Sequence, residues 1–128
     1  MLSSRAQQMD QRPPDVIVLG TEWPERALLR AQLIEQGYDV VAVDAWPIPL
    51  TYCQPGMQPR VLVVDLHELP RPRETLDEVR SVLPPDRVVV LTALGSLAPA
   101  AVRALGFNVV ERPATIGEIV DAIASSFR

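Results

Sequence analysis

Residues 60–70 read RVLVVDLHELP, and this stretch decides the fold. Four apolar residues, Val61–Val64, lead directly to Asp65, which is typical of a buried parallel strand that ends at a polar group. Open α/β sheets hold their chemistry at the carboxyl ends of such strands. Asp65 is therefore either a functional residue at a site or the first solvated residue after the strand.

Short Val-rich runs of this kind recur along the chain, and stretches with helical spacing separate most of them. This alternation predicts an α/β fold: a five-stranded parallel sheet with right-handed crossovers, doubly wound in the flavodoxin-like strand order 2-1-3-4-5. Asp65 then lies at the switch point, beside the loop that follows the first strand. The expected strands are Val16–Leu19, Val40–Val43, Val61–Val64, Val88–Leu91 and Val109–Val110.

We expect a helix after each strand except the second. In the first helix, Ala27, Ala31 and Ile34, with Leu28 beside them, form the expected apolar stripe. The last helix begins with a capping box at 115–118. The remaining expectations are Leu76, Val79 and Leu83 on one face of the helix after the third strand, a short helix at 98–105, and a stripe of Ile116, Ile119, Val120 and Ile123 in the last helix.

Residues 44–59 are the exception, because four prolines leave room for at most one helical turn, near 50–53. We expect an irregular lid over the sheet there. Its role is either packing, which we favour, or a partner surface that loses little entropy on binding. The side chains expected to cover the sheet are Trp46, Ile48, Leu50 and Tyr52.

The composition suits one acidic globular domain of 128 residues, with a net charge of −4 that argues against nucleic-acid binding. The polar start predicts a disordered tail at 1–14 before a domain at 15–128, with neither a signal peptide nor a membrane span. Cys53 is the only cysteine, so we expect a buried or half-buried thiol and a reducing, cytoplasmic location.

Four segments in order resemble the receiver domain of two-component response regulators, over about residues 15–127. VVDL places Asp65 at the family's phosphoacceptor position. VVVLTA, residues 88–93, places Thr92 at the switch hydroxyl. ERPATIGEIVDAI places Arg112 at the family's lysine and Pro113 at its usually cis proline, while EQGYDVVAV is similar to the end of the first helix and the second strand.

The sequence departs from the family at the positions that support phosphorylation. Gly20 and Thr21 occupy the positions of the acidic pair that holds Mg²⁺ in the family, and only Glu22, one residue on, is acidic. Asp65 and Glu22 would be the metal ligands, so Mg²⁺ binding is possible but weakened, and no other cofactor is expected. The aromatic switch position holds Val109, with Phe107 two residues early.

These departures leave alternatives open at two residues. Arg112 either forms a direct ion pair with Asp65, which would fill the phosphate site, or is an exposed residue before a turn. Thr92 either bonds a phosphoryl oxygen or satisfies a strand-end carbonyl. His67 is expected to be an exposed loop side chain and a poor metal ligand.

We therefore expect a degenerate receiver, a pseudo-receiver that is not an enzyme and that signals by binding a protein partner such as a histidine kinase or an effector. The alternative is a working receiver in which a histidine kinase phosphorylates Asp65. A homodimer through the last helix is a further expectation. The sequence contains no glycine-rich phosphate-binding motif, so we do not expect a nucleotide cofactor. As the resemblance implies, the candidate partner face is the last helix with the preceding strand and helix, where we expect Arg103, Glu111, Arg112, Glu118 and Asp121 to be exposed.

Overall fold

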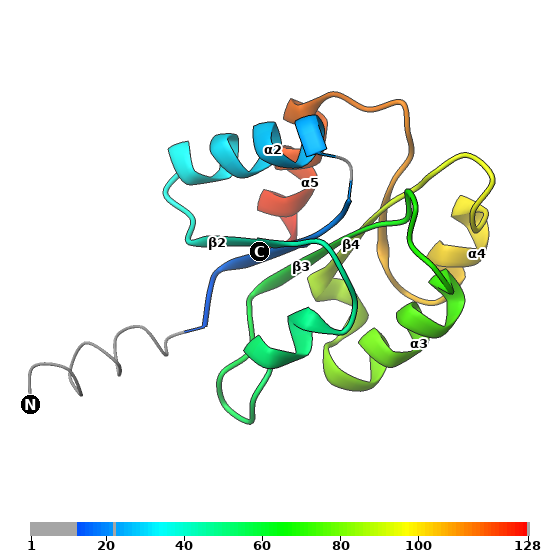
Figure 1. The fold of residues 1–128 in the computed structure, drawn as a ribbon, viewed down its shortest axis with the longest axis horizontal. Coiled ribbons are helices and arrows are strands. Elements are labelled where there is room, and N and C mark those ends of the chain that lie inside the picture. The colour runs from blue at the N-terminus through cyan, green and yellow to red at the C-terminus, as the bar shows by residue number, and fades with distance from the viewer. Residues whose placement is uncertain (1–12, 22, 128) are drawn as a thin grey trace, which may run out of the picture.

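The computed structural model describes residues 13–21 and 23–127. It contains the expected five-stranded sheet, in which all strands are parallel and follow the order β2-β1-β3-β4-β5 (Figure 1). The strands are β1 (Val16–Leu19), β2 (Val40–Val43), β3 (Val61–Asp65), β4 (Val88–Leu91) and β5 (Asn108–Val110). The helices are α2 (Trp23–Glu35), α3 (Pro72–Val82), α4 (Pro99–Ala104) and α5 (Ile116–Ser126), with short 3-10 helices η1 (Ile48–Tyr52) and η2 (Pro85–Arg87).

Each face of the sheet has its own apolar core. Val16 and Val18 of β1 point to the side covered by α2 and α5, and Ile17 and Leu19 point to the side covered by α3 and α4. Side chains alternate along a strand, so a run with no polar residue supplies both cores. Each fully buried Val, Leu or Ile contributes about 1.5–3 kcal/mol to folding. These two cores hold the carboxyl ends of the strands in place.

The expected apolar stripe of α2 is wrong. Leu28 and Ile34 are 58% and 46% exposed, and the two alanines of the stripe are exposed as well. The helix instead buries Leu29 and Leu33, which are at most 1% exposed. Apolar residues occur on two faces of this helix, and the face with two leucines removes more apolar area from water than the face with two alanines.

The last helix follows its prediction. Thr115 caps it, because its hydroxyl oxygen accepts a hydrogen bond from the Glu118 backbone N–H at 3.1 Å. Ile119, Val120 and Ile123 are buried against the sheet. The Arg112–Pro113 peptide bond, which precedes the helix, is cis, as the family resemblance implies. The α3 prediction is also confirmed, with Leu76, Val79 and Leu83 all buried.

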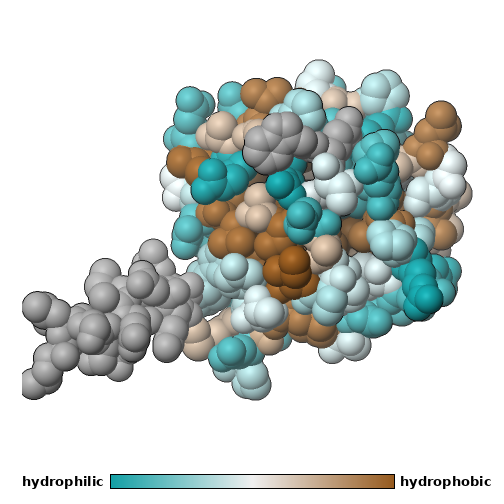
Figure 2. All heavy atoms as spheres, in the orientation of Figure 1, coloured by the Kyte–Doolittle hydropathy of each residue, from teal (hydrophilic) through white to brown (hydrophobic). Residues whose placement is uncertain are grey.

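The crossover between β2 and β3 is irregular, as expected, and its one helical turn is η1. Trp46 and Tyr52 are half-buried and pack on the core under α3 and α4. Ile48 does not cover the sheet, because it is 40% exposed. Figure 2 shows apolar side chains gathered near the middle of this face of the molecule, over the edge strand β2.

The domain boundary and the termini are described only in part. The expected tail falls largely on residues 1–12, which lie outside the described residues. Pro14, the last residue of the expected tail, is buried. None of the helices in the described part of the chain is long and apolar enough to cross a membrane.

Candidate functional site

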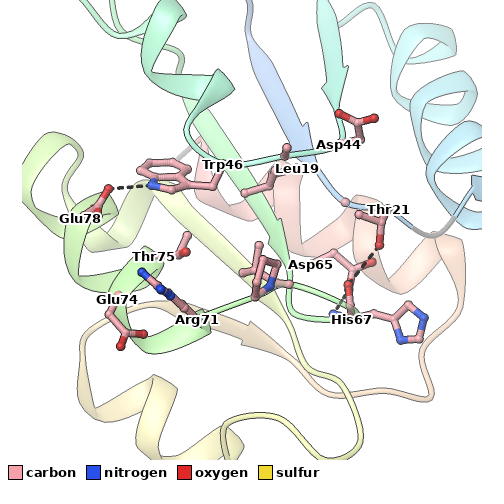
Figure 3. Close-up of a pocket in the computed structure, with 14 residues that line it drawn as sticks. Leu19, Thr21, Asp44, Trp46, Asp65, His67, Arg71, Glu74, Thr75 and Glu78 are labelled. Atoms are coloured by element: carbon pink, nitrogen blue, oxygen red, sulfur yellow. Dashed lines mark hydrogen bonds between the residues drawn. The ribbon is translucent and has the colours of Figure 1, made fainter.

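Asp65 is the last residue of β3 and is only 6% exposed, so it is not a solvated residue after the strand. It pairs with Leu91 of β4, which places it next to the residue that follows that strand, Thr92. One side of Asp65 borders a cavity of about 580 Å³ between β1, the loop after β2 and the start of α3 (Figure 3). The carboxylate is therefore held at the switch point of the sheet.

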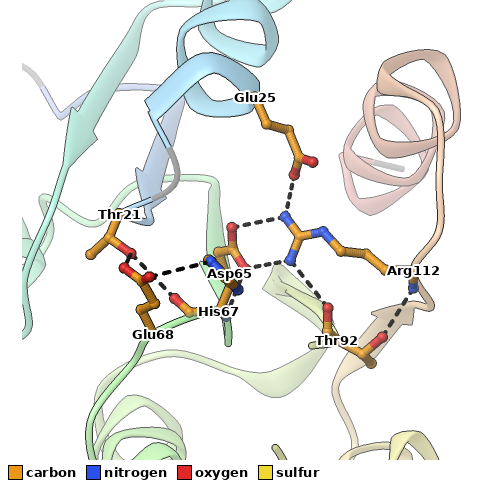
Figure 4. A network of polar contacts seen from close by, with 7 residues as sticks. All are labelled: Thr21, Glu25, Asp65, His67, Glu68, Thr92 and Arg112. Atoms are coloured by element: carbon orange, nitrogen blue, oxygen red, sulfur yellow. Dashed lines mark hydrogen bonds and ion pairs between the residues drawn. The ribbon is translucent and has the colours of Figure 1, made fainter. Parts of the chain in front are cut away.

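Both oxygens of the Asp65 carboxylate are hydrogen-bonded (Figure 4). Arg112 donates from Nη1 to Oδ1 at 2.5 Å and from Nη2 to Oδ2 at 2.8 Å, which is a bidentate pair. The backbone N–H of His67 donates to Oδ1 at 2.9 Å. Of the two alternatives for Arg112, the direct ion pair with Asp65 is the one observed. Charge-assisted bidentate contacts of this kind are among the strongest hydrogen bonds in proteins.

Arg112 makes further contacts that fix its guanidinium in the site. Its Nη2 also donates to Glu25 of α2, and its Nη1 donates to the backbone oxygen of Thr92 at 3.1 Å. The side chain is only 18% exposed, so the expectation that Arg112 contributes to an exposed partner face is wrong. The Asp65 hydrogen bond, with help from Glu25, raises the pKa of the Arg112 guanidinium although burial opposes the rise. The guanidinium therefore remains charged.

Glu25 is the site residue that sequence reasoning missed. It lies in the first turn of α2, directly beyond the carboxyl end of β1, and is half-buried. That position was the available signal, because the first turn after β1 opens onto the same edge of the sheet as Asp65. The acid expected there, Glu22, lies outside the described residues.

The Thr92 hydroxyl contacts the main chain after β5, and its expected contact with a phosphoryl oxygen stays a prediction. Its hydroxyl oxygen accepts a hydrogen bond from the Arg112 backbone N–H at 3.0 Å, and the residue is 6% exposed. Thr92 therefore ties the end of β4 to the segment after β5. Together with the contact from its backbone oxygen, it holds both the main chain and the side chain of Arg112 in position.

The two acidic-pair positions carry no charge. A Cβ atom at Gly20 would lie 3.1 Å from the Asp65 Cβ, so glycine leaves the space that the Asp65 side chain uses. The Thr21 hydroxyl is within 3.3 Å of the His67 backbone oxygen and 3.4 Å of Glu68 Oε2. Both positions therefore serve packing and loop contacts.

The described residues do not fit a Mg²⁺ ion of the kind that the family resemblance implies. Within 13–21 and 23–127, no group of three or more His, Cys, Asp or Glu side chains is arranged to hold a metal. Mg²⁺ requires oxygen ligands that are free to coordinate it. The two carboxylates nearest the switch point, Asp65 and Glu25, both engage Arg112 instead. The guanidinium supplies the positive charge at this point.

The remaining candidate residues are His67, Cys53 and Phe107. The His67 side chain is 44% exposed, as expected, and its Nε2 lies 3.6 Å from Glu68. Cys53 is half-buried and its thiol donates to the Pro49 backbone oxygen at 3.4 Å, while burial raises the pKa of the thiol. Phe107 is 4% exposed and belongs to the core under α4.

The sequence matches no protein-family model and no curated protein. Solved structures match it well in three dimensions. A protein from Chloroflexus aurantiacus assigned as a response regulator is 20% identical, with a TM-score of 0.72 over 91% of this chain and 98% of that chain. The response regulator receiver domain protein from Clostridium thermocellum is 20% identical, with a TM-score of 0.68 over 88% and 92%. Adenylate cyclase from Rhodopirellula baltica is 19% identical, with a TM-score of 0.70 over 88% and 85%.

The chain has the receiver fold. All of these identities are below 25%, so the likeness concerns the arrangement of strands and helices. Within that fold, Asp65 occupies the end of the central strand, and Arg112 and Thr92 approach it from the two strands on one side.

Proposed function

We propose that this protein is a pseudo-receiver, a signalling module with the receiver fold whose aspartate is closed by an internal ion pair. The observation that carries the proposal is the bidentate contact of Arg112 with Asp65, supported from the far side by Glu25. The module acts by binding a protein partner and does not depend on phosphorylation of Asp65.

The chemistry of aspartate phosphorylation supports this proposal. Transfer of a phosphoryl group needs a free carboxylate oxygen and a cation that neutralises the charge on the phosphoryl oxygens. Here both Asp65 oxygens already accept hydrogen bonds from Arg112. A phosphoryl donor would have to displace the guanidinium, which would then leave Glu25 and Asp65 without their cation. The positions that normally supply a metal instead hold Gly20 and Thr21.

The partner surface that we propose is formed by α4, β5 and α5, without Arg112. Arg103 of α4 and Glu111 after β5 form an ion pair at 3.2 Å, and their side chains are 51% and 57% exposed. Glu118 and Asp121 are exposed on α5. Exposed charged side chains such as these influence the orientation and the rate with which two proteins associate.

The test is the intact mass of the protein after incubation with acetyl phosphate and Mg²⁺. We expect no gain of a phosphoryl group on either the wild-type protein or Asp65→Ala, each compared with its own untreated mass. Far-UV circular dichroism of both samples shows that the proteins are folded during the assay.

A phosphoryl gain on the wild type that is lost in Asp65→Ala would contradict the proposal. It would favour the alternative, a working receiver phosphorylated on Asp65 by a histidine kinase. Arg112→Lys is the matched variant, because it keeps the charge and removes the planar fork that binds both carboxylate oxygens. We expect it to remain unmodified, since the acidic pair is still missing.

A further inference from the structure

A second feature of the switch point is the cavity of about 580 Å³ that borders Asp65 (Figure 3). Small-molecule sites in proteins have volumes of about 300–1,000 Å³ and combine apolar walls with a few polar groups. This cavity has apolar walls at Leu19, Leu69 and Trp46. The cavity shares Asp65 with the ion pair but is not lined by Arg112 or Glu25, and it extends toward the start of α3.

Thr75 places an unpartnered hydroxyl in this cavity. The residue is 4% exposed, and no described group forms a hydrogen bond with its hydroxyl. In Figure 3 its side chain lies between Trp46 and Arg71, which also line the cavity. The hydroxyl is open to the cavity and is not a sealed, unsatisfied atom, so water or a ligand group can act as its hydrogen-bond partner. A ligand that enters the cavity would supply that partner.

The charges around the cavity are mostly negative. Asp44, Glu74 and Glu78 line it, against the single guanidinium of Arg71. Asp65 lines it as well, but its charge is already paired with Arg112. Asp44 and Glu74 are exposed and form no ion pair with a described residue. The local charge therefore favours a positive ligand group over a negative one.

Trp46 gives the cavity an aromatic wall with a fixed orientation. Its indole N–H donates to Glu78 Oε2 at 2.7 Å, and the ring packs on the core on its other side. A cation above an indole face is attracted by the ring, more strongly than above any other aromatic side chain. The same carboxylate that orients the ring adds to the negative charge near it.

We propose that this cavity binds a small organic cation, an amine or guanidine carried on an aromatic or apolar body. The body lies against Leu19 and Leu69, and the positive charge lies near Trp46 and Glu74. The Thr75 hydroxyl accepts a hydrogen bond from the cationic group. The inference goes beyond the proposed function, because binding there requires no particular state of Asp65.

The test compares three probes of similar shape: phenethylamine, 2-phenylethanol and 3-phenylpropanoate. The readout is the indole N–H signal of Trp46 in the ¹⁵N–¹H spectrum of the full chain, which Trp23→Phe distinguishes from the other indole signal. We expect phenethylamine to shift this signal saturably and to bind at least about fivefold more tightly than the alcohol. We expect no saturable shift with the carboxylate.

Two variants separate the charge from the shape of the cavity. Glu74→Gln should weaken phenethylamine binding by about two- to fivefold and leave 2-phenylethanol unchanged. Thr75→Val keeps the shape of the side chain and should weaken the amine by removing the acceptor. Asp121→Asn, which removes a charge on α5 and leaves the cavity intact, is the matched control and should change neither affinity.

Three results would overturn the proposal. One is equal binding of the amine and the alcohol, which would mean that charge does not select the ligand. The second is tighter binding of the carboxylate, which would assign the cavity to anions through Arg71. The third is no saturable shift with phenethylamine at its highest soluble concentration in a folded protein.

Discussion

Replacing Arg112 by alanine removes the guanidinium that donates hydrogen bonds to both oxygens of the Asp65 carboxylate. The variant leaves the carboxylate, 6% exposed, with the His67 backbone N–H as its remaining described donor. A pair of unit charges about 4 Å apart is worth about 4 kcal/mol in an environment of effective dielectric constant 20. Breaking a buried pair costs about 3–5 kcal/mol, because an uncompensated charge stays buried. Glu25 and Arg112 are 26% and 18% exposed, so water reaches part of the site and the lower value, about 3 kcal/mol, is expected.

The assay is urea unfolding followed by far-UV circular dichroism, as a double-mutant cycle of Arg112→Ala and Asp65→Ala. We expect the double variant to be more stable than the sum of the single variants predicts, by about 2 kcal/mol, because it no longer buries an uncompensated Asp65 carboxylate. The half-buried Glu25 loses its cation in Arg112→Ala and in the double variant alike, so that cost cancels in the cycle. The exposed pair Arg103 and Glu111 is the matched control, and its cycle should give a coupling of at most about 1 kcal/mol. Additivity of the Arg112 and Asp65 changes within about 0.5 kcal/mol would refute the reasoning.

Three further predictions concern the surroundings of the site and the fold. Thr92→Val should lower the free energy of unfolding by about 1–3 kcal/mol, because the Arg112 backbone N–H loses its acceptor, whereas Thr92→Ser should keep most of that stability. Urea unfolding measures both variants. Equal stability of the two would mean that the Thr92 hydroxyl does not stabilise the segment after β5. Burial raises the pKa of Cys53, so at pH 8 its thiolate fraction is lower in the folded protein than in the unfolded chain. Cys53 should therefore react more slowly with a thiol reagent in buffer than in urea, which spectrophotometry measures. For the same reason, the free energy of unfolding should decline as the pH rises above the ordinary pKa of a thiol. Thr115→Ala should destabilise α5 by about 1 kcal/mol in thermal unfolding while Thr115→Ser does not, since only the first removes the acceptor for the Glu118 N–H.

The sequence predicts the sheet well because apolar runs without alternation have one stable solution. A strand such as Val61–Val64 must be covered on both faces, and helices between such strands then require a parallel sheet. The last helix was equally predictable, because a cap at Thr115 and a single apolar stripe agree with each other. These local and global preferences are consistent, so the spacing alone decides the outcome.

The buried face of α2 was not predictable from spacing. Leu29 and Leu33 repeat at helical distance, and so do Ala27 and Ala31, so periodicity allows either face. Tertiary packing decides between them, because the leucines fill more of the space over the sheet. The irregular crossover between β2 and β3 was predictable, because its four prolines prevent a long helix. The 40% exposure of Ile48 was not, because it depends on which side of η1 faces the core.

The site was predictable as a neighbourhood and only partly as a set of contacts. The strand order brings Asp65, Thr92 and Arg112 to one edge, and the ion pair was one of two arrangements that the sequence left open. The choice depends on the length and direction of an arginine side chain, which starts after β5 and reaches the carboxylate at the end of β3 across β4. Glu25 escaped prediction because an acid in the first turn of a helix is common for reasons of the helix dipole alone.

The measurement that tests the account most directly is side-chain NMR of Arg112 in the ¹⁵N-labelled protein at low temperature. If the guanidinium is held by Asp65 and Glu25, its Nη–H protons should give separate, slowly exchanging signals, which Arg112→Lys assigns by their loss. Those signals should collapse or exchange rapidly in Asp65→Ala while the fold persists. A single averaged Arg112 signal in the wild-type protein, unchanged by Asp65→Ala, would mean that the arginine does not close the site.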